Sequence, residues 1–197
     1  MKKNLLTAFL MTLATTLLLG IIYPLVVTAL AQLIFPRKAN GQLVEVNGRL
    51  IGSRILGQGF SGARYFHPRP SFVNYDATNS NGSQLGPTNH VLVDRVKNDT
   101  AALHAENPDL PVPIDMVTTS ASGLDPDVTP AAAEFQIPRV AKARGLSEDQ
   151  VRALVREHTE SRQFGFLGEA RVNVLELNLA LDHLGPQAAV SSLSQNR

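Results

Sequence analysis

The sequence predicts an extracytoplasmic α+β or α/β domain tethered by one N-terminal transmembrane helix. Two observations lead to this fold class. No charged residue stands between Asn4 and Pro36, and all 17 acidic residues lie beyond that stretch. The rest of the sequence mixes strand-like and helix-like patterns, as an ordinary domain does. We therefore expect an anchor over residues 1–36, a mixed α/β domain over residues 37–184 and a flexible tail over residues 185–197.

The anchor is expected because the apolar run Leu5–Ile34 is longer than the roughly 20 residues that cross a bilayer. Pro24 interrupts the run, but a membrane helix tolerates one proline when nearby groups satisfy the freed carbonyl. Gly20 is small and would let a second helix approach closely. The run therefore reads as a spanning helix with a surface for a neighbour.

A cleaved signal peptide is the competing interpretation of the same run. The sequence begins with a basic pair, and Ala29-Leu30-Ala31 resembles a cleavage site. The apolar stretch before Pro24 exceeds a usual signal-peptide core, which favours an uncleaved anchor. Basic residues flank both ends of the run, Lys2 and Lys3 before it and Arg37 and Lys38 after it. Charge alone therefore leaves the orientation close to a tie, and we expect the N-terminus in the cytoplasm and the domain outside.

Composition excludes several classes of function. The chain has 18 Lys and Arg residues against 17 Asp and Glu residues, and its net charge is +1. Nucleic-acid binding needs a basic excess that this balance does not supply. The absence of cysteine excludes disulfides, thiolate metal sites and a cysteine nucleophile.

A hairpin and a long loop are expected directly after the anchor. Leu43–Val46 and Arg49–Ile51 flank Asn47-Gly48, a dipeptide that supplies the two positive φ angles of a type I′ turn. Residues 52–89 are rich in Gly, Ser, Asn and Pro and show no periodicity. A loop of this length is functional or disordered, and its aromatic residues favour an ordered, functional loop.

The second half of the chain is expected to be mostly helical. In chain order we expect a helix over residues 90–106 capped by Thr88 or Asn89, a short strand over residues 114–117, a helix from the cap Thr129 towards Gly145 that Pro138 kinks or splits, and a helix opened by the capping box of Ser147 and Gln150. Residues 172–184 fit both a strand and a helix, and we expect a helix capped by Asn173.

No catalytic residue and no metal ligand set is expected. The sequence lacks the phosphate-binding G-x-x-x-x-G-K-[ST] pattern and the zinc-binding H-E-x-x-H pattern. His67, Arg69 and the loop of residues 82–89 are the groups that a membrane-anchored extracytoplasmic enzyme or ligand-binding domain would use. That function is kept as the alternative to an accessory, interaction-based role.

Ordered motifs along most of the chain resemble one family, the C subunits of the bacterial Kdp potassium-transporting ATPases. The motifs are Tyr23-Pro24-Leu25, Phe35-Pro36, Ala39-Asn40-Gly41, Gly52-Ser53, Leu56–Phe60, Tyr65-Phe66-His67, Arg69-Pro70-Ser71, Val117–Asp125, Thr129-Pro130, Ala132-Ala133, Gln136–Arg144 and Val172–Asp182. The sequence departs from the family pattern at Pro68, where glycine is expected, and in the looser run of residues 79–83.

The resemblance implies a single-pass subunit of the bacterial inner membrane. Its implied partners are a channel-like potassium-binding subunit, a P-type ATPase subunit and a small single-helix subunit, which together import potassium at the expense of ATP. Its implied role is non-catalytic: it stabilises the complex and acts as a catalytic chaperone that raises the ATP affinity of the ATPase subunit. No stably bound cofactor is implied, and ATP is the ligand that it could share with that subunit.

The resemblance also suggests candidate contact residues. A domain outside the cell cannot touch cytoplasmic ATP, so its effect on ATP affinity would be an indirect coupling between subunits. In the inverted topology, nucleotide contacts are expected at Ser120, Ser122, Gly123, Asp125 and Gln136. Contacts with partner subunits are expected at Gly20, Pro24, Tyr65, Phe66, His67 and Arg69. A weaker hypothesis is that the domain gates or filters the extracellular entrance for potassium.

Overall fold

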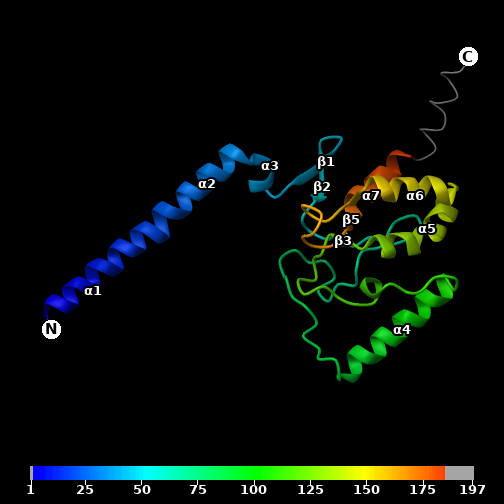
Figure 1. Cartoon of the computed structure of the whole chain (residues 1–197), viewed down its shortest axis with the longest axis horizontal. Coiled ribbons are helices and arrows are strands. Elements are labelled where there is room, and N and C mark those ends of the chain that lie inside the picture. Colours follow the sequence, from blue (N-terminus) through cyan, green and yellow to red (C-terminus); the bar gives the residue numbers. More distant parts are fainter. Residues whose placement is uncertain (1, 185–197) are drawn as a thin grey trace, which may run out of the picture. The chain divides into compact units, whose positions relative to one another are not determined.

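A computed structural model describes residues 2–184 of the chain (Figure 1). The expected tail over residues 185–197 lies outside the described residues. The described chain mixes helices and small sheets, in agreement with the expected class, and it divides into two compact units, Met1–Ser53 and Arg54–Arg197. The division falls after the first hairpin and not at the end of the apolar run.

The first unit begins with one long helix built from three segments. These are α1 (Lys2–Thr15), the π-helical η1 (Thr16–Ile22) and α2 (Tyr23–Ile34). By length and composition, the helix Lys2–Ile34 is the one candidate among the described residues for crossing a membrane, and none of its side chains is buried. The π-helical segment ends directly before Tyr23-Pro24. In a regular α-helix a proline ring clashes with the carbonyl of the residue four positions earlier. Widening of the helix here accommodates that ring.

The expected hairpin is confirmed. It follows the short helix α3 (Pro36–Ala39) and consists of the antiparallel strands β1 (Leu43–Val46) and β2 (Arg49–Ser53). Asn47 and Gly48 have φ angles of 53° and 74°, as a type I′ turn requires. The hydroxyl of Ser53 donates to the carbonyl of Gly41 at 2.6 Å, so the end of the hairpin lies beside the residues that precede it.

The second unit contains a three-stranded antiparallel sheet that the sequence did not predict. Its strands lie in the order β3 (Asp127–Val128), β5 (Arg171–Asn173) and β4 (Thr159–Glu160). Two or three residues cannot display an alternating pattern, so the sequence carries no visible signal for these strands.

Helices make up most of the ordered secondary structure of this unit. They are α4 (His90–Glu106), the 3₁₀-helix η2 (Ile114–Met116), α5 (Pro130–Arg144), α6 (Glu148–Glu157) and α7 (Val174–His183). The expected caps Asn89, Thr129 and Asn173 and the capping box of Ser147 and Gln150 are confirmed. Residues 171–184 combine both interpretations of the sequence, because a short strand leads directly into the capped helix.

Two local expectations need correction. The strand predicted over residues 114–117 is wrong, because Ile114–Met116 forms a 3₁₀ turn. Asp115 is buried in that turn and accepts hydrogen bonds from the backbone N–H (2.8 Å) and hydroxyl (3.2 Å) of Thr129, an arrangement that holds the turn against the start of α5. Pro138 does not split α5, which is one helix from Pro130 to Arg144.

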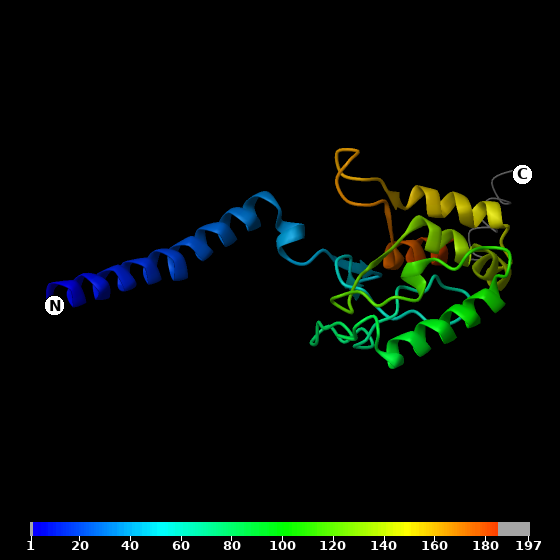
Figure 2. The same ribbon diagram turned by 60° about the horizontal axis from the view of Figure 1, so that its bottom comes forward.

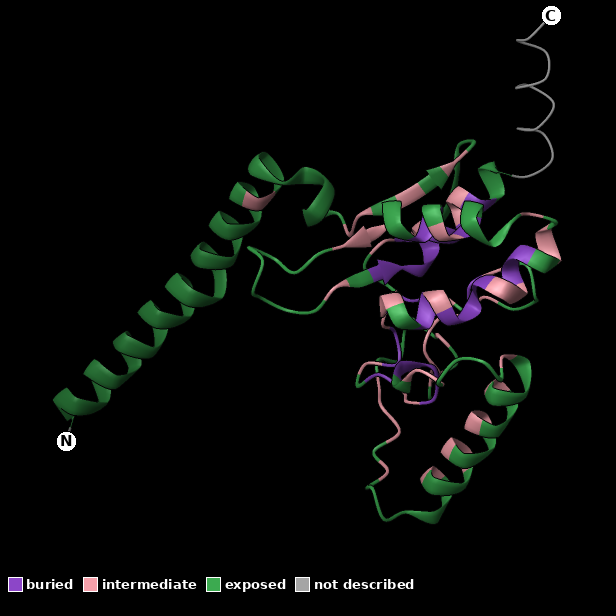
Figure 3. Cartoon of the chain, turned by 45° about the vertical axis from the view of Figure 1, so that its right-hand side comes forward, coloured by how far each residue is buried: buried purple, intermediate pink, exposed green. Residues whose placement is uncertain are grey.

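The core of the second unit lies between α5, α6, α7 and the sheet (Figure 3). One aromatic side chain from the long loop, Phe66, is fully buried among them. In contrast, α4 has no buried residue, and Figures 1 and 2 place it apart from α6 and α7. Residues 54–89 contain no helix or strand and cover the core as an ordered loop.

Gly57 lies against the turn that precedes β3, and its replacement tests the close packing of the long loop. Its N–H donates to the carbonyl of Leu124 at 2.7 Å, and a Cβ atom at Gly57 would lie 2.5 Å from the carbonyl oxygen of Asp125. We expect Gly57→Ala to lower the free energy of unfolding by about 2 kcal/mol, as overpacking does. Gly86→Ala is the matched control, because a Cβ there meets no atom within 4 Å. Equal denaturation midpoints for the two variants would contradict the prediction.

Candidate functional site

Two buried amides hold the centre of the long loop. The backbone N–H of Phe66 donates to Oδ1 of Asn178 at 2.8 Å, and Nδ2 of Asn178 donates back to the carbonyl of Phe66 at 2.9 Å. Gln136 bonds the next residue in the same way. The backbone N–H of His67 donates to Oε1 of Gln136 at 2.7 Å, and Nε2 of Gln136 donates to the carbonyl of His67 at 3.1 Å. We call Gln136 and Asn178 the amide clamp. It fixes two consecutive loop residues to α5 and α7.

Two arginines of α5 bind the carbonyls on the N-terminal side of the amide clamp. Nη1 of Arg139 donates to the carbonyls of Ala63 and Tyr65 at 2.9 and 3.0 Å. Nε of Arg144 donates to the carbonyl of Arg64 at 2.6 Å. The side chain of Arg144 is only 3% exposed, and it also pairs with Asp182 at 2.8 Å. Residues 63–67 are therefore fastened at nearly every backbone position.

Tyr65 and His67 flank the buried Phe66, and both side chains have intramolecular partners. The guanidinium of Arg144 lies 5.0 Å from the centre of the Tyr65 ring. Nε2 of His67 lies 2.9 Å from the carbonyl of Gly62. A carbonyl only accepts, so this ring nitrogen carries the proton. Burial lowers the pKa of His67, and although the bond to Gly62 opposes that shift, the ring is held neutral near pH 7.

Arg69 and Asp125 bring together one residue from each predicted contact set. Nη1 of Arg69 pairs with Oδ2 of Asp125 at 2.9 Å, and Oδ1 of Asp125 accepts the backbone N–H of Asp127 at 3.1 Å. The hydroxyl of Tyr75 donates to the carbonyl of Arg69. The ion pair thus joins the long loop to the turn before β3.

The other predicted nucleotide contacts belong to that same turn, with the exception of Gln136. Ser120 is 8% exposed, and Oγ of Ser122 accepts the N–H of Leu124 at 3.1 Å. Gly123 has a φ of 69°, and its carbonyl accepts the hydroxyl of Ser71 at 2.7 Å. A Cβ on Gly123 would lie 2.7 Å from atoms of the long loop, so only glycine fits there.

A hollow of about 250 Å³ lies beside the pair of Arg69 and Asp125. Its lining carries four carboxylates and two guanidinium groups, from Asp115, Asp125, Asp127, Glu169, Arg69 and Arg171. Burial raises the pKa of Asp127, although Asn173 and Arg171 act in the opposite direction. The excess of carboxylates repels polyphosphates and suits a cation better. Among the described residues, no group of three His, Asp or Glu side chains could hold a metal ion.

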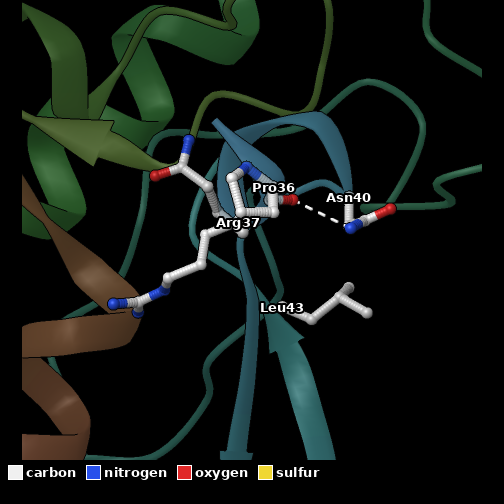
Figure 4. A pocket seen from close by; sticks show the side chains of 5 residues that line it. Pro36, Arg37, Asn40 and Leu43 are labelled. Carbon is white, nitrogen blue, oxygen red and sulfur yellow. Dashed lines mark hydrogen bonds between the residues drawn. The ribbon is translucent and has the colours of Figure 1, made fainter. Parts of the chain in front are cut away.

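A second hollow, of about 260 Å³, lies in the first unit between α3 and the start of β1 (Figure 4). Its wall is mostly apolar, and Arg37 and Leu43 extend to opposite sides of it (Figure 4). Nδ2 of Asn40 donates to the carbonyl of Pro36 at 2.8 Å, which tightens the turn after the long helix. This hollow contains none of the predicted nucleotide-contact or partner-contact residues.

Most of the predicted contact residues lie in three segments of the chain, two of which are joined by the pair of Arg69 and Asp125. Gly20 and Pro24 lie on the long helix, where a Cβ on Gly20 would meet only Thr16, at 3.9 Å. Residues 65–69 form the clamped loop, and residues 120–125 form the adjoining turn. Gln136 bonds the clamped loop, and its hydrogen bonds are with His67, Met116, Ala132 and Arg139. The nucleotide-contact and partner-contact roles both stay predictions.

Sequence reasoning missed Asn178, Arg139 and Arg144. A signal for Asn178 was present, because this polar residue stands among the apolar positions of the expected helix 172–184. Buried polar side chains of this kind usually bond backbone groups. No local pattern indicated which loop residues the two arginines would meet, since 74 to 80 residues separate the partners.

Comparison with known proteins gives a consistent result. The family model described as "KdpC: K+-transporting ATPase, c chain" matches residues 5–183. A potassium-transporting ATPase KdpC subunit of Koribacter versatilis is 63% identical over 188 residues, which cover 94% of this chain and 97% of that protein. KdpC subunits of Rhodopseudomonas palustris BisB18 and Methylorubrum populi are 55% and 54% identical, covering 92% and 93% of this chain and 98% of each relative.

Replacing Asn178 tests the amide clamp. Asn178→Ala leaves the buried N–H and carbonyl of Phe66 without partners, and we expect a loss of roughly 2–4 kcal/mol in the free energy of unfolding. Asn178→Asp keeps an acceptor but loses the donor, and it should also be destabilised. Asn98→Ala, on the exposed surface of α4, should change stability by less than about 0.5 kcal/mol. A near-neutral Asn178→Ala in urea unfolding would refute the assigned role.

His67 predicts a pH dependence of stability. Its folded pKa lies below the ordinary value near 6.5, so the unfolded chain binds more protons between the two values. The contribution of the neutral His67 ring to the free energy of unfolding is therefore complete above about pH 6.5. It is lost as the pH falls from there through the lowered pKa of the folded state. His67→Gln keeps a donor for Gly62 and does not titrate. We expect its urea midpoint to fall less steeply than that of the parent below pH 6.5, and equal slopes would contradict this.

Proposed function

The chain belongs to the KdpC family, the C chains of K⁺-transporting ATPases, and from this premise we propose that it is a non-catalytic accessory subunit of an ATP-driven potassium importer. As a KdpC subunit it is part of a potassium transport complex in the membrane, with one N-terminal candidate transmembrane helix. The phosphorylation motif of P-type ATPases, Asp-Lys-Thr-Gly, does not occur in the sequence. One helix also cannot enclose a selective pore, which needs rings of coordinating groups.

The observation that carries the accessory role is the fastening of the long loop. The polar groups that the sequence made candidates for chemistry already bond within the chain: His67 to Gly62, Arg69 to Asp125, and Gln136 to His67. Such groups give a rigid surface and leave few side chains free to act on a substrate. Rigid surfaces lose little entropy on docking, which favours stable assembly.

We assign the partners by family membership and by the surfaces of this chain. The long helix would lie against the membrane subunits, with Gly20 and Pro24 at the contact, because a glycine lets a neighbouring helix approach. The clamped loop, with Tyr65, His67 and Arg69 at its surface, would contact the potassium-binding subunit. The P-type ATPase subunit and the small single-helix subunit complete the proposed complex.

The N-terminus is proposed to lie in the cytoplasm and the second unit outside. In this topology ATP never meets residues 54–184, and the proposed increase in ATP affinity is a coupling free energy that passes through the membrane subunits. The hollow beside Arg69 supports this choice, because its four carboxylates outnumber its two guanidinium groups and their excess negative charge opposes the binding of a triphosphate. The inverted topology, with nucleotide at residues 120–125, is the outcome that would replace it.

No observation favours an anchored enzyme. That alternative relied on His67, Arg69 and residues 82–89. The first two have the intramolecular partners described above, and Gly82 packs so closely that a Cβ would lie 2.9 Å from the carbonyl of Ala121.

ATP dependence and topology test the proposal together. We expect removal of this chain from the purified complex to raise the half-saturating ATP concentration of potassium-stimulated ATPase activity by roughly 5- to 150-fold, the usual range of allosteric coupling. Protease added to intact spheroplasts should digest the second unit, and protease added to inside-out vesicles should not.

The matched control is a variant at the candidate nucleotide turn. Ser122→Ala removes one side-chain hydroxyl, which accepts a hydrogen bond from the N–H of Leu124. If the second unit lies outside the cell, this variant should leave the half-saturating ATP concentration unchanged. A domain that is digested only in inside-out vesicles, together with a raised ATP requirement for Ser122→Ala, would establish direct nucleotide contact and overturn the outward topology.

A further inference from the structure

The loop between β4 and β5 displays apolar side chains to solvent. Phe164 is 87% exposed, Phe166 is 71% exposed and Leu167 is 47% exposed. We call these three residues the apolar tip. Large apolar side chains clustered on a surface mark a contact with a partner or with a membrane. No role has been given to this tip by the accessory function proposed above.

The loop holds the apolar tip in a defined conformation. Phe164 and Gly165 have φ angles of 53° and 82°, and such a φ is unfavourable for a phenylalanine. The N–H of Gly165 donates to the carbonyl of Arg162 at 3.1 Å. Below the turn, Arg162 pairs with Glu169 at 2.5 Å. The turn thus presents the aromatic rings outward and keeps them off the core of the unit.

The apolar tip rises from the place where the second unit begins. Arg54 is the first residue of that unit, and its guanidinium pairs with Glu160, at the end of β4. Its carbonyl accepts Nδ2 of Asn173, at the end of β5, at 2.9 Å. The loop of residues 161–170 therefore starts next to Arg54. Because at most five extended residues lead up to the end of this loop and five lead back, the loop can extend no more than about 17 Å from the ends of β4 and β5.

The connection from the long helix to Arg54 is short. The side-chain amides of Gln32 and Asn40 bond each other at 3.1 and 3.2 Å, which folds residues 33–40 back on the end of the helix. The bond from Ser53 to Gly41 brings the two ends of the hairpin together, so residues 41–53 add almost no length. Residues 33–53 therefore add little length between the helix and Arg54, and this short connection limits how far the apolar tip can lie from the end of the helix.

We propose that Phe164, Phe166 and Leu167 insert into the interfacial layer of the lipid bilayer that the long helix spans. Aromatic rings favour the headgroup region, where their apolar faces leave water. The paired charges of Arg162 and Glu169 add no net charge that would resist approach to the membrane. Lipid is chosen over a protein partner because the bilayer is the surface whose distance from the tip this chain itself limits. The proposal rests on the proposed membrane anchor.

The absence of tryptophan from the chain allows a clean test. The full-length Phe166→Trp variant is reconstituted in nanodiscs of phosphatidylethanolamine and phosphatidylglycerol, without other subunits. We expect blue-shifted tryptophan emission that is quenched by lipids brominated near the headgroup. Adding Phe164→Ser and Leu167→Ser to this variant should return the emission towards that of a solvated indole.

Two further variants separate the possible failures. Val91→Trp places a probe at a 67% exposed site on α4 and should remain solvated and unquenched. Leu18→Trp lies in the long helix and should be quenched by lipids brominated along the acyl chain; if it is not, the membrane anchor itself fails. If Leu18→Trp is quenched and Phe166→Trp is not, lipid insertion is refuted. Protection of Phe166→Trp only after the other subunits are added would show that the tip contacts protein, and it would also overturn the proposal.

Discussion

The structure of the second unit depends on the backbone hydrogen bonds that Gln136 and Asn178 make with Phe66 and His67. A loop of more than thirty residues without secondary structure has peptide groups that its own backbone does not satisfy, and burying them costs free energy unless side chains replace the water. The two amides supply donor and acceptor together, which allows Phe66 to lie fully buried in the core. Arg139 and Arg144 likewise donate hydrogen bonds to the carbonyls of neighbouring loop residues. Helices α5 and α7 thus supply hydrogen bonds to the centre of a loop that contains no helix or strand of its own.

This construction agrees with the accessory role proposed above. The polar side chains that sequence patterns bring to notice, such as His67 and Arg69, are consumed in holding the fold. The surfaces left over are of another kind: a wholly exposed apolar helix, a helix α4 without buried residues, and the apolar tip. Removing apolar surface from water is favourable, so the long helix and the apolar tip gain stability when something covers them. A KdpC chain is therefore best understood through its neighbours in the transport complex and the membrane around it.

Much of the local structure could be predicted from the sequence, because the signals were local. Asn47-Gly48 determines its hairpin, and Thr129-Pro130 and Ser147 with Gln150 determine where helices begin. The strands β3, β4 and β5 could not be predicted, since two or three residues give no period and β3 pairs with β5 across more than forty positions. Ile114 to Val117 was predicted as a short strand, but the contacts of Asp115 with Thr129 hold Ile114–Met116 in a 3₁₀ turn. Of the candidate site, the sequence indicated residues 65–69 and 120–125 only as separate candidate contacts, whose roles stay predictions. The link between these segments through Arg69 and Asp125 depends on the tertiary fold.

The π-helical turns before Pro24 have a consequence for how the long helix meets other helices. An α-helix turns by about 100° per residue, and a wider helix turns by less. Seven residues of wider helix therefore rotate everything after Ile22 about the axis relative to a uniform α-helix. A stripe of side chains that faces one direction along α1 is not continued by the same heptad spacing along α2. One straight span can thereby offer differently oriented faces at its two depths, and two distinct neighbours can pack on it without competing for the same side.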